Sequence, residues 1–122
     1  EHRTALLGLA CGAIGFVGYA FATTPTMLFA SVPLACLIGL TMPALRAILS
    51  RATPANAQGE LQGAIAGIVS FTAVVIPFTM THLFSWATAT HPPFPGASFL
   101  AAAVALAVGA AVLVRVRVPG RA

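Results

Sequence analysis

The sequence predicts an all-α integral membrane protein with four transmembrane helices, and two observations carry this prediction. Apolar residues make up 59% of the chain and charged residues 7%, whereas roughly a quarter of the residues of an ordinary soluble domain are charged. The apolar residues also gather in long stretches, each close to the ~20 residues that cross ~30 Å of hydrocarbon. We expect helices over residues 4–23, 27–50, 60–84 and 97–114.

The Arg residues flank these stretches at positions that share one side of the membrane if every stretch crosses it. They are, in chain order, Arg3, Arg46, Arg51, Arg115, Arg117 and Arg121. The connections on the other side, residues 23–26 and 85–96, contain no Arg or Lys. Because short loops rich in Arg stay cytoplasmic, both ends and the central loop are predicted to be cytoplasmic.

The same charge distribution excludes several classes of function. The net charge of +4 sits at segment ends, where it sets topology and meets anionic lipid, so the bilayer is an expected partner and nucleic acid is not. No nucleophile lies beside a base, and there is no Gly-rich phosphate loop or metal-ligand cluster, so we expect no enzyme, no cofactor and no metal site. Cys11 and Cys36 lie inside predicted helices and are interpreted as small buried side chains rather than a disulfide or a metal site.

The first two stretches carry the residues that shape membrane helices. Gly8, Gly12 and Gly15 share one face of the first, and such small faces let helix backbones approach closely in lipid. In the second stretch, Pro33 and Pro43 each remove a backbone hydrogen bond, so we expect kinks or local unwinding. The chain begins directly before a membrane helix with no leader of its own, which favours a part of a longer polypeptide.

The third and fourth stretches are joined to the rest by breaks rich in proline. Thr53-Pro54 resembles a helix start, with a capping hydroxyl and Pro in the first turn, and residues 85–96 are predicted to be the longest external loop. The fourth stretch has a close-packing face at Ala101, Ala105 and Gly109. On the third stretch a stripe of small or polar side chains predicts packing against a neighbouring helix or, alternatively, a cavity wall; its members are Gly59, Gly63, Ala66, Ser70, Ala73, Pro77 and Thr81.

Two runs resemble a known family. Residues 42–51 read MPALRAILSR and residues 58–63 read QGELQG, and this pair resembles the tenth and eleventh helices of tetracycline-efflux-type transporters of the major facilitator superfamily. The run GYAFAT at residues 18–23 and the run FPGA at residues 94–97 agree with the same resemblance. It covers essentially the whole chain, residues 1–122, as the last four of twelve helices.

The resemblance implies a proton-coupled efflux transporter in a bacterial inner membrane, with both ends of this segment cytoplasmic. Its expected partners are the missing amino-terminal helices, a small-molecule substrate and protons. Residues implied in the family motif or in gating are Pro43, Arg46, Arg51, Gln58, Gly59, Glu60, Gln62, Gly63 and Pro77. The resemblance implies Ser31, Thr41 and Met42 in the substrate path, and the cavity-wall interpretation of the stripe on the third stretch adds Ser70 and Thr81.

Two positions depart from the family pattern. Tetracycline exporters resembling this chain carry an intramembrane Asp where this sequence has Gly12, and the sequence contains no Asp at all. They also have Gly-Pro where this chain has Ile76-Pro77. Tetracycline is therefore in doubt as the substrate, and the proton-binding acids are expected in the missing helices.

The ionisable residues within or near the stretches have alternative interpretations. Glu60 lies in the first turn of its helix, where it favourably meets the helix dipole in a structural or gating role; the alternative is a proton-carrying acid. Arg46 either extends to the interface or reaches Glu60 across the loop. His82 lies near the external end of the third stretch beside Thr79, either simply solvated or handling protons.

Two other functions remain open at this point. Four spans in a chain of this length is the architecture of small multidrug-resistance transporters, although those rely on a Glu in the first helix and this first stretch contains none within the membrane. A membrane module that assembles partners without transporting anything is the second alternative.

Overall fold

The computed structural model describes residues 1–116, so Arg117 and Arg121, which the sequence places on the cytoplasmic side, lie outside the described residues. Every regular element within this range is helical. The elements are α1 (His2–Phe21), α2 (Pro25–Cys36), η1 (Leu37–Leu40), α3 (Thr41–Ala52), η2 (Ala55–Ala57), α4 (Gln58–Ala89) and α5 (Ala97–Arg115).

These elements make four helical segments that are long and apolar enough to cross a membrane, as the sequence predicted. Their bounds are His2–Phe21, Pro25–Ala52, Ala55–Ala89 and Ala97–Arg115. The α-helical ends lie within two residues of the predicted ones, with one exception at the end of α4. The all-α, four-span prediction is therefore confirmed.

The exception is the last part of α4, where the predicted end at Phe84 is wrong. The helix continues to Ala89, because no proline lies between Phe84 and Pro92 to end it. The Thr88 hydroxyl donates to the Phe84 carbonyl at 2.8 Å, within the added turn. The external loop is therefore shorter than predicted, running over residues 90–96.

The second span is bent where its prolines predicted unwinding. Between α2 and α3 the four residues of η1 form a tighter 3₁₀ turn, and Pro43 follows at the third position of α3. Pro43 has no N–H to donate to the Gly39 carbonyl, so an α-helical bond is missing at this point. Pro33 lies inside α2 without ending it, so the local unwinding is placed at η1 alone.

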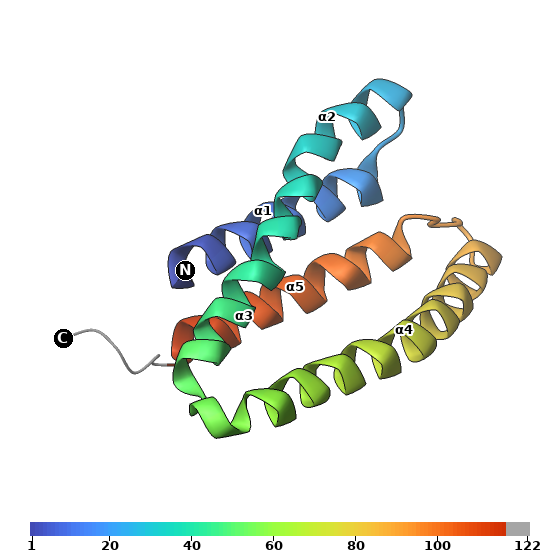
Figure 1. Ribbon diagram of the computed structural model, residues 1–122. Helices are drawn as coiled ribbons and strands as arrows, with labels where there is room; N and C mark the ends of the chain where they lie inside the picture. The colour runs from blue at the N-terminus through green and yellow to red at the C-terminus, as the bar shows by residue number, and fades with distance from the viewer. Residues whose placement is uncertain (117–122) are drawn as a thin grey trace.

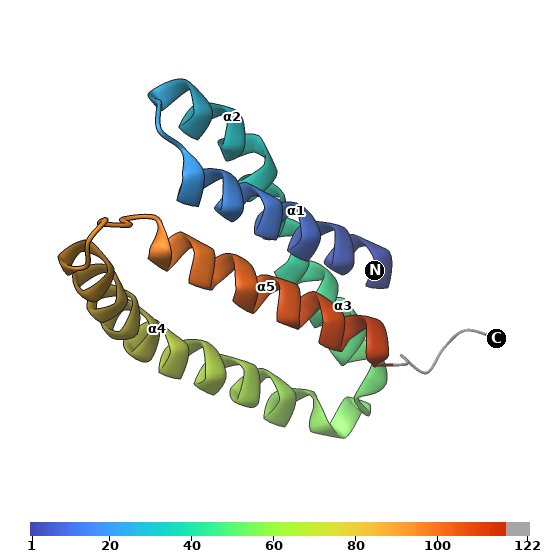
Figure 2. The ribbon, with the colours of Figure 1, turned by 180° about the vertical axis from the view of Figure 1, so that it is seen from behind.

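Helix α1 is the centre of the arrangement. It packs along α2, η1 and α3 on one side and along α5 on the other, and Figures 1 and 2 show it between these two neighbours. Helix α4 contacts α5 and α3 only sparsely, and it runs as a separate arm from the end of α3 back to the start of α5 (Figure 1). A compact group of α1, α2, α3 and α5 therefore carries one loosely attached helix.

The predicted glycine face of α1 is confirmed as the contact with the second span. A Cβ atom added at Gly15 would lie 2.8 Å from the Cα atom of Ala35, which real Cβ atoms do not tolerate, so the two backbones approach as closely as glycine allows. Gly18, which the sequence analysis did not include, continues the face by one more step of three residues. The pairs along the contact are Gly8 with Thr41, Gly12 with Ile38, Gly15 with Ala35 and Gly18 with Ser31.

The predicted close-packing face of α5 is confirmed in part. Ala101 and Gly109 are half-buried, and a Cβ atom added at Gly109 would lie 3.9 Å from the Leu9 side chain of α1. Ala105 is exposed, so its place in the face is wrong, and Ala103 is the buried residue of α5. At the start of this contact, an added Cβ at Gly96 would run into the Ala20 carbonyl, so a glycine is required where the chain enters α5.

The glycine contact predicts a position-specific effect on stability. Gly15→Ala is expected to lower the free energy of unfolding by about 1–3 kcal/mol, because the methyl group meets backbone atoms of Ala35 that cannot rotate away. Gly67→Ala is the matched control, since an added Cβ there meets nothing within 4 Å; it is expected to be neutral or to stabilise by up to ~1 kcal/mol. Reversible unfolding of the purified protein in mixed micelles measures both, and equal losses in the two variants would contradict the contact.

Candidate functional site

The residues predicted to line a substrate path separate into two groups in the structure. Ser31 and Thr41 face α1, where they meet Gly18 and Gly8. Met42, Ser70 and Thr81 are exposed. Their roles in transport stay predictions, but only the second group is open to a ligand within the described part of the chain.

Thr41 is the most unusual of these residues. Only 7% of its surface is exposed, and its hydroxyl has no hydrogen-bond partner among residues 1–116. The hydroxyl lies against Gly8 at the point where η1 passes into α3. Ser31, by contrast, is satisfied, since its hydroxyl donates to the Met27 carbonyl at 3.0 Å.

The stripe of small residues on α4 has no neighbour within the described residues. A Cβ atom added at Gly59, Gly63 or Gly67 would meet nothing within 4 Å, and the other stripe members on α4 are exposed. Thr81 donates within the helix, to the Pro77 carbonyl at 2.8 Å. Neither the packing nor the cavity interpretation of this stripe is decided inside the described chain.

The charged side chains gather at one end of the molecule. The guanidinium of Arg51 lies 2.8 Å from the Glu1 carboxylate, an ion pair that joins the end of α3 to the start of α1. The Arg51 side chain is 77% exposed, so the pair contributes only about 0–1 kcal/mol. The pair shows that the end of α3 and the start of α1 lie together, near the chain's amino terminus in Figure 1.

Glu60 and Arg46 lie at this same end but do not pair. Glu60 is in the first turn of α4, as predicted, and both side chains are exposed. The only ion pair among residues 1–116 is that of Arg51 with Glu1, so the predicted alternative in which Arg46 reaches Glu60 is not formed. The reason is geometric: Gln58, and not Glu60, faces back onto the end of α3.

Gln58 closes the corner between α3 and α4. Its side-chain nitrogen donates to the carbonyls of Ser50 and Thr53, both at 2.8 Å, and its side-chain oxygen accepts from the Ser50 hydroxyl at 3.1 Å. The short helix η2 does begin directly after Pro54, as the Thr53-Pro54 pair predicted, but the predicted capping hydroxyl is wrong. Thr53 instead terminates α3, and its hydroxyl donates backward to the Leu49 carbonyl at 2.8 Å.

The other motif residues are placed as follows. Pro43 lies next to the 3₁₀ turn η1, and Pro77 lies inside α4, which remains helical through it. Gln62 is exposed and makes no side-chain hydrogen bond within residues 1–116. His82 packs edge-on against Phe78 with ring centroids 4.7 Å apart, and its predicted alternatives, solvation or proton handling, remain predictions.

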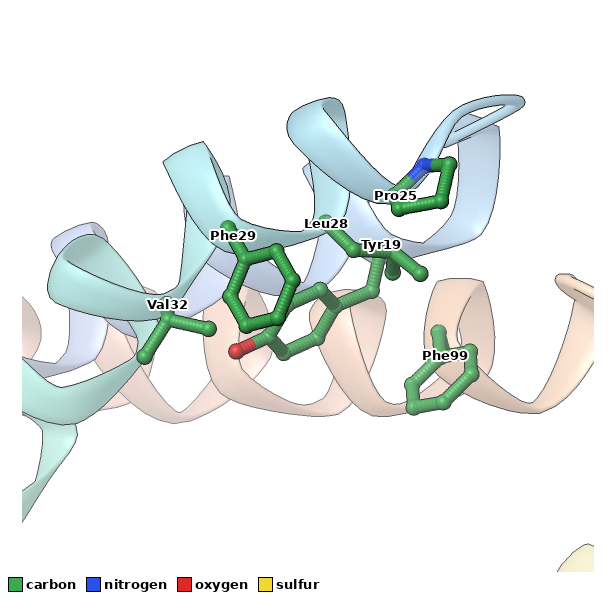
Figure 3. A pocket seen from close by; sticks show the side chains of 6 residues that line it. All are labelled: Tyr19, Pro25, Leu28, Phe29, Val32 and Phe99. Carbon is green, nitrogen blue, oxygen red and sulfur yellow. The ribbon is translucent and has the colours of Figure 1, made fainter.

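An aromatic groove at the opposite end of the molecule was not predicted. It has a volume of about 380 Å³, and it opens over α1 between α2 and α5 (Figure 3). Tyr19 and Phe99 form an edge-to-face pair across it, with centroids 5.6 Å apart. Its lining residues are Tyr19, Pro25, Leu28, Phe29, Val32 and Phe99.

One signal in the sequence points toward this groove. Tyr19 is the only Tyr of the chain, near a helix end where aromatic residues mark the membrane interface. The partner Phe99 is far away in sequence, and pattern alone does not bring the two together. The groove suits an apolar group.

Comparison with known proteins finds several tetracycline resistance proteins among the relatives of this chain. The chain is 40% identical over 85 residues, 70% of its length, to the class G tetracycline resistance protein of Vibrio anguillarum. It is 37% identical over 90 residues, 74% of its length, to the class C tetracycline resistance protein of Escherichia coli. These matches confirm the resemblance that the MPALRAILSR and QGELQG runs predicted.

The chain spans about a fifth of the length of these relatives, namely 22% and 23%. A further match is to the human Hippocampus abundant transcript 1 protein, 38% identical over 68 residues, which is 56% of this chain and 14% of that protein. No protein-family profile matches the chain. No solved structure matches it either.

The unpartnered hydroxyl of Thr41 gives a prediction about stability. Thr41→Val is expected to leave the free energy of unfolding unchanged or to raise it by about 1 kcal/mol. The substitution replaces a buried hydroxyl that has no hydrogen-bond partner by a methyl group of similar size. Unfolding in mixed micelles measures this. A clear loss of stability would mean that the hydroxyl has a partner which the described residues do not provide.

Proposed function

The chain is related to the tetracycline resistance proteins, and we propose that it is the last four of twelve helices of a proton-coupled exporter of the major facilitator superfamily. The observation that carries this proposal is the 40% identity to a tetracycline resistance protein over 70% of the chain. Four membrane-length helices agree with it. The cargo is proposed to be a drug or another small molecule.

The transported proton is proposed to bind outside this segment. Of the two Glu residues of the chain, Glu1 is paired with Arg51 at the charged end, and Glu60 lies exposed in the first turn of α4. Neither is placed midway along a helix, where an intramembrane acid carries protons. The amino-terminal helices of the same exporter are therefore proposed to supply the proton-binding carboxylates.

Gly12, which stands where the family has its Asp, has no room for a larger side chain. A Cβ atom added at Gly12 would lie 3.0 Å from the Cβ of Ile38, so any larger side chain would have to push η1 away from α1. We infer that Gly12 serves helix packing, and that the substrate is recognised without an acid at this place. A substrate other than tetracycline fits this arrangement.

The orientation and location follow from the charged end. We propose that the end carrying Arg3, Arg46, Arg51 and Arg115 faces the cytoplasm, since Arg-rich short loops are retained there. The location is a bacterial inner membrane. Exposed residues of the second and third spans, Met42, Ser70 and Thr81, are then the ones that remain available to a central substrate path.

Two alternatives predict a different gene. A small multidrug-resistance-like transporter and a membrane assembly module would both be complete with four helices, whereas the exporter requires about eight more upstream. The relatives, which are several times longer than this chain, favour the exporter. None of the described residues places a nucleophile beside a base, so no enzymatic activity is proposed.

Transport assays test the proposal directly. In everted membrane vesicles, the whole protein that contains this chain is expected to accumulate a drug when a proton gradient is imposed, and to stop when the gradient is collapsed. The 122-residue chain expressed alone is expected to insert without accumulating drug, because it has no intramembrane acid to couple the two movements. Proton-driven accumulation of drug by the short chain alone would contradict the proposal and favour the small multidrug-resistance alternative.

A further inference from the structure

We propose that Gln58 is a positioning residue that locks the end of α3 to the start of α4, so that the second and third spans turn as one rigid corner during transport. The transport part of this proposal rests on the exporter function proposed above. The lock itself rests on hydrogen bonds within the described chain and is testable without any transport.

The Gln58 amide uses both of its polar atoms on the preceding helix end. Its nitrogen donates two hydrogen bonds of 2.8 Å, to the carbonyls of Ser50 and Thr53, and its oxygen accepts from the Ser50 hydroxyl at 3.1 Å. The side chain is half-buried. A side chain held at three points has one geometry, so it fixes the direction in which α4 leaves the corner.

The end of α3 needs such a partner. The last carbonyls of a helix have no donor within the helix, and here Pro54 removes an N–H that would otherwise follow. The Thr53 N–H reaches the Ser50 carbonyl only at 3.4 Å, near the limit of a hydrogen bond. Gln58 therefore supplies the main donor to these two carbonyls, and it does so from the first residue of α4.

This corner is the principal link between the second and third spans. Within residues 1–116, α4 meets α3 only sparsely and does not contact α1 or α2. Its other anchorage is at the far end, where the Ser98 hydroxyl donates to the Met80 carbonyl at 3.2 Å. An arm held only near its two ends takes its orientation from those ends, and Gln58 determines one of them.

The chain provides its own control for a test. Gln62 has the same side chain, lies one helical turn further along in the same QGELQG run, is exposed and makes no side-chain hydrogen bond within residues 1–116. Gln58→Glu keeps the shape and an acceptor for Ser50 but loses both donors. Ser50→Ala removes only the 3.1 Å bond.

The first measurement is amide hydrogen exchange of residues 50–58 in the whole protein, reconstituted in lipid nanodiscs. Gln58→Ala and Gln58→Glu are expected to exchange about tenfold faster in this stretch, because two carbonyl bonds that close the corner are lost. Ser50→Ala is expected to change the rate by less than about threefold. Gln62→Ala should match the wild type. Unchanged exchange in both Gln58 variants overturns the lock.

The second measurement is drug export by the same variants in everted vesicles. Gln58→Ala is expected to lower kcat by about fivefold with KM nearly constant, since Gln58 is not placed to touch substrate and acts on the movement. Faster exchange together with wild-type kcat would overturn the coupling of the two spans. If the wild-type protein exports no drug, both the proposed function and the role of Gln58 in transport are contradicted. The hydrogen-exchange result still tests whether Gln58 holds the corner between α3 and α4.

Discussion

Charge cannot remain in hydrocarbon without a large cost, and this constraint accounts for most of the arrangement. The described charged side chains all lie at one end, near the chain's amino terminus: α1 begins there with Glu1 and Arg3, α3 ends there with Arg46 and Arg51, and α5 ends there with Arg115. Glu60 follows at the start of α4. Four passages between a charged end and an uncharged end are the consequence.

Inside the hydrocarbon, apolar side chains gain nothing from leaving lipid for protein, so helices associate through close approach of their backbones. In this chain α1 provides that approach with a row of glycines against the second span, and it meets α5 on its other side. Helix α4 carries glycines too, but nothing in the described chain approaches them. The compact part is therefore the part with the glycine contact, and the third span is held at its corners, one of which Gln58 closes.

The sequence predicted those features that depend on composition and local chemistry: the four spans, the charged end, the glycine face of α1 and the unwinding near Pro43. It failed where the outcome depends on contacts between elements. Whether Ala105 belongs to the packed face of α5, and whether Gln58 or Glu60 turns back to α3, are decided by neighbours distant in sequence or by side-chain direction. The pairing of Tyr19 with Phe99 is of the same kind. The buried hydroxyl of Thr41 could not be foreseen either, because threonine in a membrane helix usually bonds to its own backbone.

The most direct test of this account is the side of the membrane on which each end lies. Single cysteines at Asn56 and at His91, both exposed, in a background with Cys11 and Cys36 replaced by Ser, report the two ends to a maleimide that does not cross membranes. The account predicts that intact cells label His91→Cys, and that Asn56→Cys is labelled only after permeabilisation. Labelling of both positions in intact cells, or of Asn56→Cys alone, would contradict it.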